Sequence, residues 1–239
     1  MSYIDGFLVP VPKTNKQAYI DKAKEALPLF KEFGNTRLVE NWGDDVHVGK
    51  LTDFRMAVKA EEGEEVVFSW MEYPDKAARD AAGQKMMSDP RMKSLGDDMA
   101  FDGKRMVYGG FAPMLDEGPG GKLGYADGFV APVKAGNKQA YLDMATKAAV
   151  VFQEHGATRV VEAWGDDVPE GKTTDFKMAV KAEPDESIVF SFVEWPSKAA
   201  RDAGWEKIMK DERMQPGDNP MPFDGKRMIY GGFSPVVDA

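Results

Sequence analysis

The first third of the chain carries apolar residues in two different periodicities. Residues 3–11 are rich in aromatic and β-branched types and end between Pro10 and Pro12, which predicts a strand. Thr14 and Gln17 then have the spacing of a capping box, which predicts the start of a helix. Apolar residues follow at helical spacing and form one stripe: Tyr19, Ala23, Ala26, Phe30 and Phe33.

Five more segments complete the pattern. We predict a strand at 37–42, a turn at 43–45, and either a strand pair or one bulged hairpin over 54–59 and 66–73. A second helix is expected to begin after Asp75 and end near Asp89, and the last strand to span 105–113. This order predicts an α+β, ferredoxin-like domain with an antiparallel sheet.

The whole pattern occurs twice. Residues 3–115 align with 125–237 without a gap at an offset of 122, and about three-fifths of the aligned pairs are identical. The best-preserved stretch, Phe101–Phe111, returns as Phe223–Phe233 with one change. We therefore expect three segments, which are a ferredoxin-like repeat at 1–116, a Gly/Pro linker at 117–124 and a second repeat at 125–239.

The two copies are expected to pack on each other. Alternate positions along the strands are apolar on both faces, as at Phe7 and Leu8, so helices on one face leave an apolar face uncovered. The short linker spans at most about 30 Å. We therefore predict an intrachain dimeric α+β barrel, a pseudo-dimer that is a monomer or a weak homodimer in solution. The last strand of each copy, with its Gly-Gly pair, is expected to meet its counterpart from the other half.

Composition narrows the possible functions. The formal net charge is −9 with lysines and arginines dispersed among the acids, so we expect no nucleic acid partner. The absence of cysteine excludes thiol nucleophiles and Cys-based metal sites. The first residues do not resemble a signal peptide, and no apolar run approaches bilayer length, so we expect a cytoplasmic protein without a membrane partner.

Polar residues on strands give the candidate site. Glu40 and Trp42 share a strand face by parity, and Arg105 and Tyr108 lie near the last strand. Glu40 beside Trp42 is open to two interpretations, either a desolvated general base or a structural partner of Arg105. The candidate pocket comprises both sets: Glu40, Trp42, Arg105, Tyr108, Glu162, Trp164, Arg227 and Tyr230.

Other motifs are interpreted as structural. The loop 165–173 has five residues between its glycines where a Walker A loop has four, and its acids would repel phosphate. Asp44-Asp45 and Asp166-Asp167 offer few ligands for a cation, which favours solvated turns. The two histidines, His47 and His155, are not equivalent in the repeat, so we expect no metal and no cofactor.

Several longer motifs carry a family resemblance. Asp5-Gly-Phe7, Val39–Asp45, Val67–Trp70 and Phe101–Met106 together resemble the YbaA-like bacterial family of unknown function, in the dimeric α+β-barrel superfamily. The resemblance covers each copy nearly from end to end. It implies a ferredoxin-like fold that pairs into a barrel, normally from two chains, and it implies no reaction.

Three classes of function follow. One is a protein, enzyme or not, that binds a small apolar or acidic molecule in the barrel interior. A second is a structural or interaction module with a filled core. The third, a monooxygenase-like oxidoreductase, rests on superfamily analogy alone.

Overall fold

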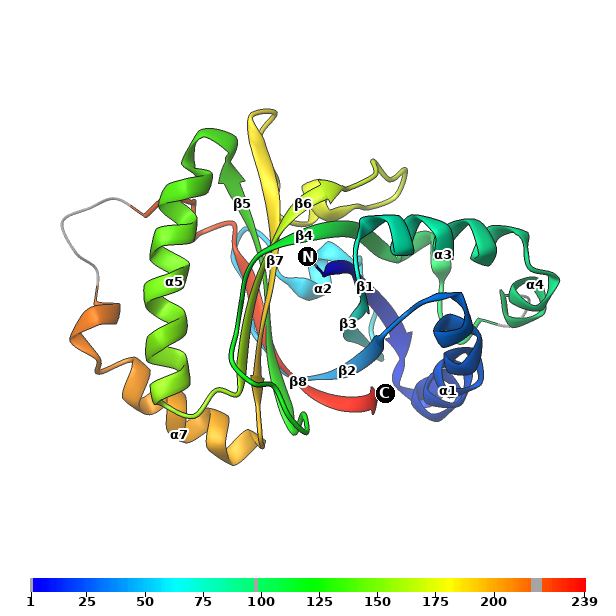
Figure 1. Cartoon of the computed structure of the whole chain (residues 1–239), viewed down its shortest axis with the longest axis horizontal. Coiled ribbons are helices and arrows are strands. Elements are labelled where there is room, and N and C mark those ends of the chain that lie inside the picture. The colour runs from blue at the N-terminus through cyan, green and yellow to red at the C-terminus, as the bar shows by residue number, and fades with distance from the viewer. Residues whose placement is uncertain (1, 97–98, 216–220) are drawn as a thin grey trace.

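The computed structural model describes residues 2–96, 99–215 and 221–239 (Figure 1). Over these residues the chain forms eight strands, which are β1 Tyr3–Pro12, β2 Arg37–Val46, β3 Glu64–Tyr73, β4 Val107–Glu117, β5 Tyr125–Lys134, β6 Arg159–Asp167, β7 Glu186–Trp195 and β8 Ile229–Asp238. The α-helices are α1 Lys16–Phe33, α2 Phe54–Ala57, α3 Lys76–Ser88, α4 Pro90–Gly96, α5 Lys138–Glu154, α6 Phe176–Ala179 and α7 Lys198–Ile208. Short 3₁₀ turns are η1 Lys13–Asn15, η2 Gly103–Arg105, η3 Ala135–Asn137 and η4 Glu212–Met214.

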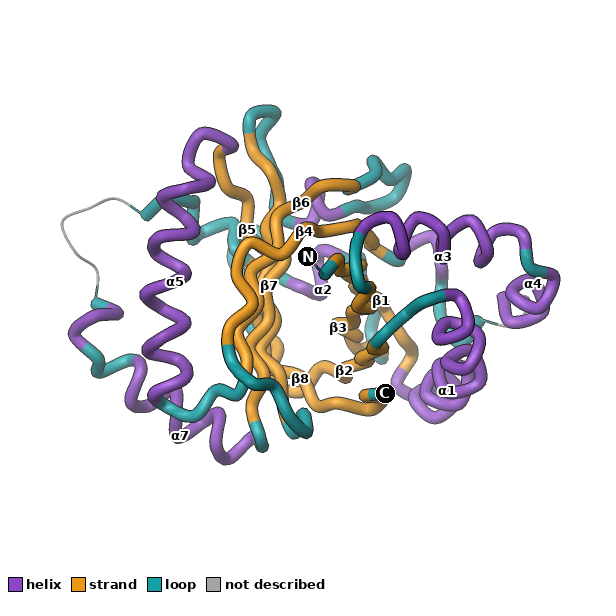
Figure 2. The backbone as a smooth tube through the Cα atoms, in the orientation of Figure 1, coloured by secondary structure: helices purple, strands orange, loops and turns teal. Residues whose placement is uncertain are grey.

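The strands form one closed antiparallel barrel in the order β1-β3-β2-β8-β5-β7-β6-β4 (Figure 2). The predicted α+β class with an antiparallel sheet is confirmed. Each copy contributes four consecutive strands of the barrel, and the copies join where β2 pairs with β8 and where β4 pairs with β6. Within the described part of the chain every strand therefore has two neighbours, which removes the open edges of both sheets.

The last strand does not meet its counterpart, so that expectation is wrong. β4 pairs instead with β6, and the register shifts where Gly110 faces Asp167 and Phe111 faces Gly165. β8 pairs with β2 in the same manner. Glycines lie on both strands of each joint, and a β-carbon on Gly110 would come 2.6 Å from the Tyr3 hydroxyl, so glycine leaves room for a neighbouring side chain.

Aromatic rings fill the barrel. The rings of Phe68 and Phe190 stack at 4.6 Å, and Trp70 and Phe192 stack at 4.0 Å, so each pair joins the two copies. All four side chains are fully buried. A β-carbon on Gly6 would lie 2.8 Å from the Phe190 ring, so the glycine of the first Asp-Gly-Phe motif makes room for the other copy's aromatic ring.

Helices cover the outside of the barrel and close one end. α1 and α3 pack on one another beside the strands of the first copy, while α5 and α7 lie on the opposite side of the molecule (Figure 1). The short helices α2 and α6 contact each other and bring Phe54 and Phe176 into the central core. Thr52 Oγ1 donates to the carbonyl of Ala179 at 2.5 Å, which ties this end of the barrel together.

Four local predictions are corrected. Residues 54–57 are helical because Asp53 accepts a hydrogen bond from the amide of Met56 and so caps a turn. β2 continues through the predicted turn to Val46, because β8 pairs with that segment. The first helix begins at Lys16 after a 3₁₀ turn with no side-chain cap, and β4 begins at Val107, two residues later than predicted.

The predicted N-caps of the second helix in each copy are confirmed. Asp75 accepts from the amide of Ala78, and Ser197 accepts from the amide of Ala200. Among the described residues no helix is both long and apolar enough to cross a membrane.

Candidate functional site

Glu40 lies outside the barrel, in contact with the first helix. Tyr19 Oη of α1 donates to Glu40 Oε2 at 2.6 Å, and the hydroxyl of Ser69 on β3 donates to the same oxygen. Trp42 is buried on the same outer face, and Lys16 of α1 lies over its ring. The shared strand face inferred from parity is therefore present, but it faces the helix and not the barrel interior.

The second copy repeats this arrangement. Tyr141 Oη donates to Glu162 Oε2 at 2.8 Å, and the Ser191 hydroxyl donates to the same atom. Burial raises the pKa of Glu162 to about 7, although both hydrogen bonds oppose the rise. The pKa of Glu40 is raised for the same reason. Glu162 can therefore hold a proton near neutral pH, but in each copy the helix above the carboxyl restricts access for a substrate.

Arg105 is not a partner of Glu40. Its guanidinium donates to both carboxylate oxygens of Glu64, at 2.6 and 2.7 Å, and also to Asp102. Arg227 makes the same two-fold contact with Glu186 at 2.7 Å. These bidentate pairs fasten the 3₁₀ turn of the first copy and its equivalent to the neighbouring strands. Both arginines are thus occupied by structural contacts.

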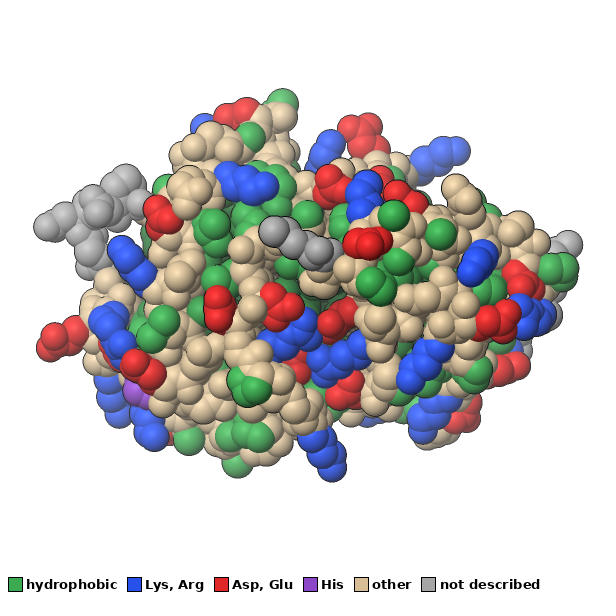
Figure 3. Space-filling model, in the orientation of Figure 1, with side chains coloured by type: hydrophobic (Ala, Val, Ile, Leu, Met, Phe, Trp, Pro, Cys, Tyr) green, Lys and Arg blue, Asp and Glu red, His purple; other side chains and the backbone are tan. Residues whose placement is uncertain are grey.

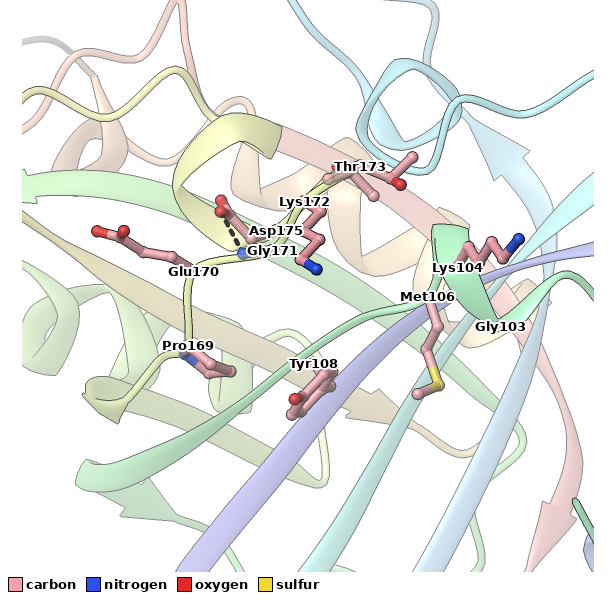
Figure 4. Close-up of a pocket in the computed structure, with 11 residues that line it drawn as sticks. Gly103, Lys104, Met106, Tyr108, Pro169, Glu170, Gly171, Lys172, Thr173 and Asp175 are labelled. Carbon is pink, nitrogen blue, oxygen red and sulfur yellow. Dashed lines mark hydrogen bonds between the residues drawn. The ribbon is translucent and has the colours of Figure 1, made fainter.

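Tyr108 faces a crevice between the two copies. The crevice has a volume of about 330 Å³. One wall comes from the first copy, with Lys104, Met106 and Tyr108, and the other from the loop 169–175 of the second copy (Figure 4). Tyr108 is 47% exposed although it lies on a barrel strand. Of the four candidate residues in the first copy, Tyr108 therefore lies in this pocket, whereas Glu40, Trp42 and Arg105 lie elsewhere.

Among the described residues, Lys172 of the crevice forms no ion pair with an acid. By contrast, the pKa of Asp102 is lowered by a hydrogen bond from Arg105 and further by the charge of Lys104. Asp175 is engaged by the amides of Gly171 and Met178, at 2.9 and 2.7 Å. Glu170 points away from the crevice in Figure 4 and lies 3.4 Å from Lys177. Lys172 projects toward the space between Met106 and Tyr108, whereas Lys104 stands at the rim (Figure 4). The crevice therefore combines an ammonium group of Lys172 that forms no ion pair with a described acid, a carboxylate of Asp175 that accepts from amides, and apolar side chains.

Sequence reasoning missed the residues opposite Tyr108. They belong to the loop 165–173, which was set aside because its glycine spacing excludes a nucleotide loop. Its Lys172 lies 64 positions from Tyr108 and on the other copy, so no local pattern joins them. The repeated Gly-Lys of that loop was the available signal.

The acidic pairs predicted to be solvated turns join the copies. Asp166 accepts from Tyr3 at 2.9 Å and from Lys76 at 2.7 Å. Arg79 of α3 bridges Asp5 of its own copy and Asp167 of the other. The equivalent residues of the second copy contact Asp44 and Asp45. The correction follows from closure of the barrel, which brings each acidic segment beside the other copy's second helix.

Charged residues also cross between the copies at another part of the barrel. Arg37 donates to Glu194 at 2.7 Å, and Arg159 donates to Glu72 at 2.8 Å. Arg37 also donates to Asp238, and Arg159 also donates to Asp116. Figure 3 shows Arg and Lys side chains interleaved with acids on the central face of the molecule. The guanidinium groups of Arg37 and Arg159 donate to carboxylates of the protein and lie over the rings of Trp70 and Phe192, so this network is structural. Among the described residues no group of three or more His, Asp and Glu is placed to hold a metal ion.

Comparison with known proteins agrees with the repeat. A family model described as "Protein of unknown function (DUF1428)" matches residues 2–103 and again 124–225. The chain belongs to this family. Uncharacterized protein YbaA of Escherichia coli K12 is 67% identical over 117 residues, which are 49% of this chain and 100% of that protein. The same identity and coverage hold for YbaA of Shigella flexneri. The predicted resemblance is confirmed, and this chain carries the family's unit twice.

Solved structures support the fold. A putative monooxygenase from Lactobacillus acidophilus aligns with a TM-score of 0.56 at 10% identity, over 100% of this chain and 95% of that one. A putative monooxygenase from Fusobacterium nucleatum aligns with a TM-score of 0.57 at 10% identity, over 99% and 93%. An anthrone oxidase-like protein gives 0.54 at 14% identity, over 100% and 92%. At such identities the likeness establishes a shared fold and no activity.

Proposed function

We propose that the protein binds a small anionic molecule with an apolar body in the crevice between its two copies. In this proposal each copy is a ferredoxin-like unit, at 1–116 and 125–239, and residues 117–124 link them into an intrachain pseudo-dimer. The strand order within each copy supports these units, since β2 and β4 lie at the edges of the first set and β6 and β8 at the edges of the second.

The observation that carries the proposal is the unpaired charge of Lys172 above the exposed ring of Tyr108. An acidic protein with net charge −9 repels anions at long range. A crevice that nevertheless leaves the ammonium group of Lys172 without an ion pair is suited to an anionic group of a ligand. The crevice volume of about 330 Å³ lies within the usual range for small-molecule sites.

The barrel interior is a poorer candidate than the crevice. Phe68, Phe190, Trp70 and Phe192 occupy its centre in stacked pairs, and their side chains are fully buried. A ligand there would have to displace rings that close the core between the copies. The filled interior favours a structural role for the barrel itself, and it moves the proposed ligand to the outer surface.

The charge assignment can be tested by calorimetric titration of the protein with benzoate and with inorganic phosphate. We expect binding that weakens at least about tenfold in Lys172→Gln, since a hydrogen bond to a charged group contributes roughly 1.5–3 kcal/mol. Lys104→Gln should have a smaller effect because it stands at the rim. Lys147→Gln, an exposed lysine of α5 away from the crevice, is the control with the same change in charge.

Three experimental results would contradict the proposal. Equal weakening by Lys172→Gln and Lys147→Gln would show that only net charge matters. No binding of either probe would leave the interaction module with a filled core as the better description. Turnover with quinones or flavins would instead indicate the oxidoreductase class.

A further inference from the structure

We propose that the crevice takes a planar aromatic carboxylate stacked on Tyr108, and that the chain binds one such molecule because His47 packs on Tyr230, the equivalent tyrosine of the second copy. This inference rests on the proposed function and adds to it the ligand class and the stoichiometry. It follows from comparing the crevice at Tyr108 with the positions around Tyr230 that the repeat makes equivalent, where some side chains differ.

The first crevice offers a free aromatic face. Tyr108 is 47% exposed, and among the described residues it forms no ring–ring contact. Met106 and Pro169 line the crevice on either side of it (Figure 4). Aromatic rings prefer offset stacking on such a surface, and a thioether adds a favourable sulfur–aromatic contact. These groups favour a flat ring over an aliphatic chain.

The charge lies where a ring substituent would reach it. Lys172 enters from the opposite wall and points toward the space between Met106 and Tyr108 (Figure 4). A carboxylate attached directly to a ring on Tyr108 would meet this ammonium. Thr173 of the same loop adds a hydroxyl to the lining. The crevice thus selects for a planar acid and not for a bare anion.

The equivalent positions around Tyr230, which we call the second crevice, keep the lysines and change the aromatic surface. Lys226 and Lys50 stand at the positions equivalent to Lys104 and Lys172. His47, however, replaces Pro169, and its ring centroid lies 4.5 Å from that of Tyr230 with the planes inclined at 40°. The imidazole therefore packs on the ring of Tyr230, which is 40% exposed against 47% for Tyr108, so that a ring of the protein itself occupies the stacking position.

Comparing binding at the two positions distinguishes attraction by charge from stacking on a tyrosine ring. If charge alone attracted the ligand, both crevices would bind, because both contain the pair of lysines. If the ligand needs a tyrosine ring that no other ring of the protein contacts, Tyr108 binds it and Tyr230 does not. The substitution Thr173 to Leu51 also removes a hydroxyl from the second crevice. The stoichiometry of binding therefore reports which interaction selects the ligand.

Equilibrium dialysis of the full-length chain with naphthalene-2-carboxylate measures this stoichiometry directly. We expect one equivalent for the wild type, no saturable binding for Tyr108→Leu, and two equivalents for His47→Ala. His47→Pro restores the residue of the first crevice and should also give two equivalents. Circular dichroism establishes that each variant is folded, and Lys147→Gln should retain one equivalent.

Other results of the dialysis experiment would each contradict a specific part of the inference. Two equivalents in the wild type, or loss of binding with Tyr230→Leu and not with Tyr108→Leu, would overturn the inference while leaving the proposed function in place. Binding of phosphate without naphthalene-2-carboxylate would do the same. A single equivalent in both His47 variants would overturn the role of His47. Binding of neither probe would overturn the proposed function as well.

Discussion

Replacement of Glu162 by Gln should make the folded protein more stable above neutral pH. The carboxyl accepts hydrogen bonds from Tyr141 and Ser191 beneath α5, and burial raises its pKa from 4.5 to about 7. Ionised Glu162 is therefore less favourable in the folded state than in the unfolded chain. Glutamine fits the same space, still accepts through its carbonyl, and carries no charge to desolvate.

The magnitude follows from the difference between the folded and unfolded pKa values. The stabilising contribution of the protonated carboxyl is fully present below pH 4.5 and is lost as pH rises through about 7. A change from 4.5 to about 7 corresponds to at most about 3 kcal/mol of unfolding free energy. Glu162 is only half-buried, so screening by solvent reduces the expected effect to about 2 kcal/mol.

Urea unfolding followed by circular dichroism at pH 5 and pH 8 provides the test. The difference in unfolding free energy between Glu162→Gln and the wild type should be small at pH 5 and reach about 2 kcal/mol at pH 8. Glu206→Gln, at an exposed position on α7, is the control and should not change the pH dependence. An equal difference at both pH values would refute the raised pKa.

Three further predictions concern how the copies are held together. Arg37→Met should destabilise the fold by about 3 kcal/mol in urea unfolding, because it leaves the fully buried Glu194 with a weaker set of partners. Gly6→Ala should cost about 1–3 kcal/mol by crowding the Phe190 ring, and Phe190→Leu in the same chain should recover part of the loss; full additivity of the two changes would contradict the contact. Native mass spectrometry should report a monomer at micromolar concentration, since barrel closure pairs the strand edges within the chain; a predominant dimer would contradict that reasoning.

Much of the fold could be predicted from local patterns. The helix caps at Asp75 and Ser197 are local, since each side chain accepts from an amide three residues later. The helix α2 was not predicted from the sequence. The cap at Asp53 precedes a helix of only four residues, and its apolar sequence resembles a strand. Short elements carry too few residues for either periodicity to be distinguished.

The candidate site was less predictable. Parity placed Glu40 and Trp42 on one face, but it could not tell which face the helix would cover. Arg105 has two acids nearby in the structure, and its choice of Glu64 depends on where the 3₁₀ turn meets β3. Tyr108 lies in a pocket only because the loop 169–175 of the second copy lies beside it.

The sequence by itself determined the duplication, the order of elements in each copy, and the need to bury two faces of each sheet. These properties follow from residue types and spacing, which act locally or through identical repetition. The tertiary structure alone decided which strands join, that Asp166 and Asp167 receive Lys76 and Arg79 of the other copy, and that Lys172 faces Tyr108. The physical reason is that barrel closure joins segments by shape and register, and these depend on both copies at once.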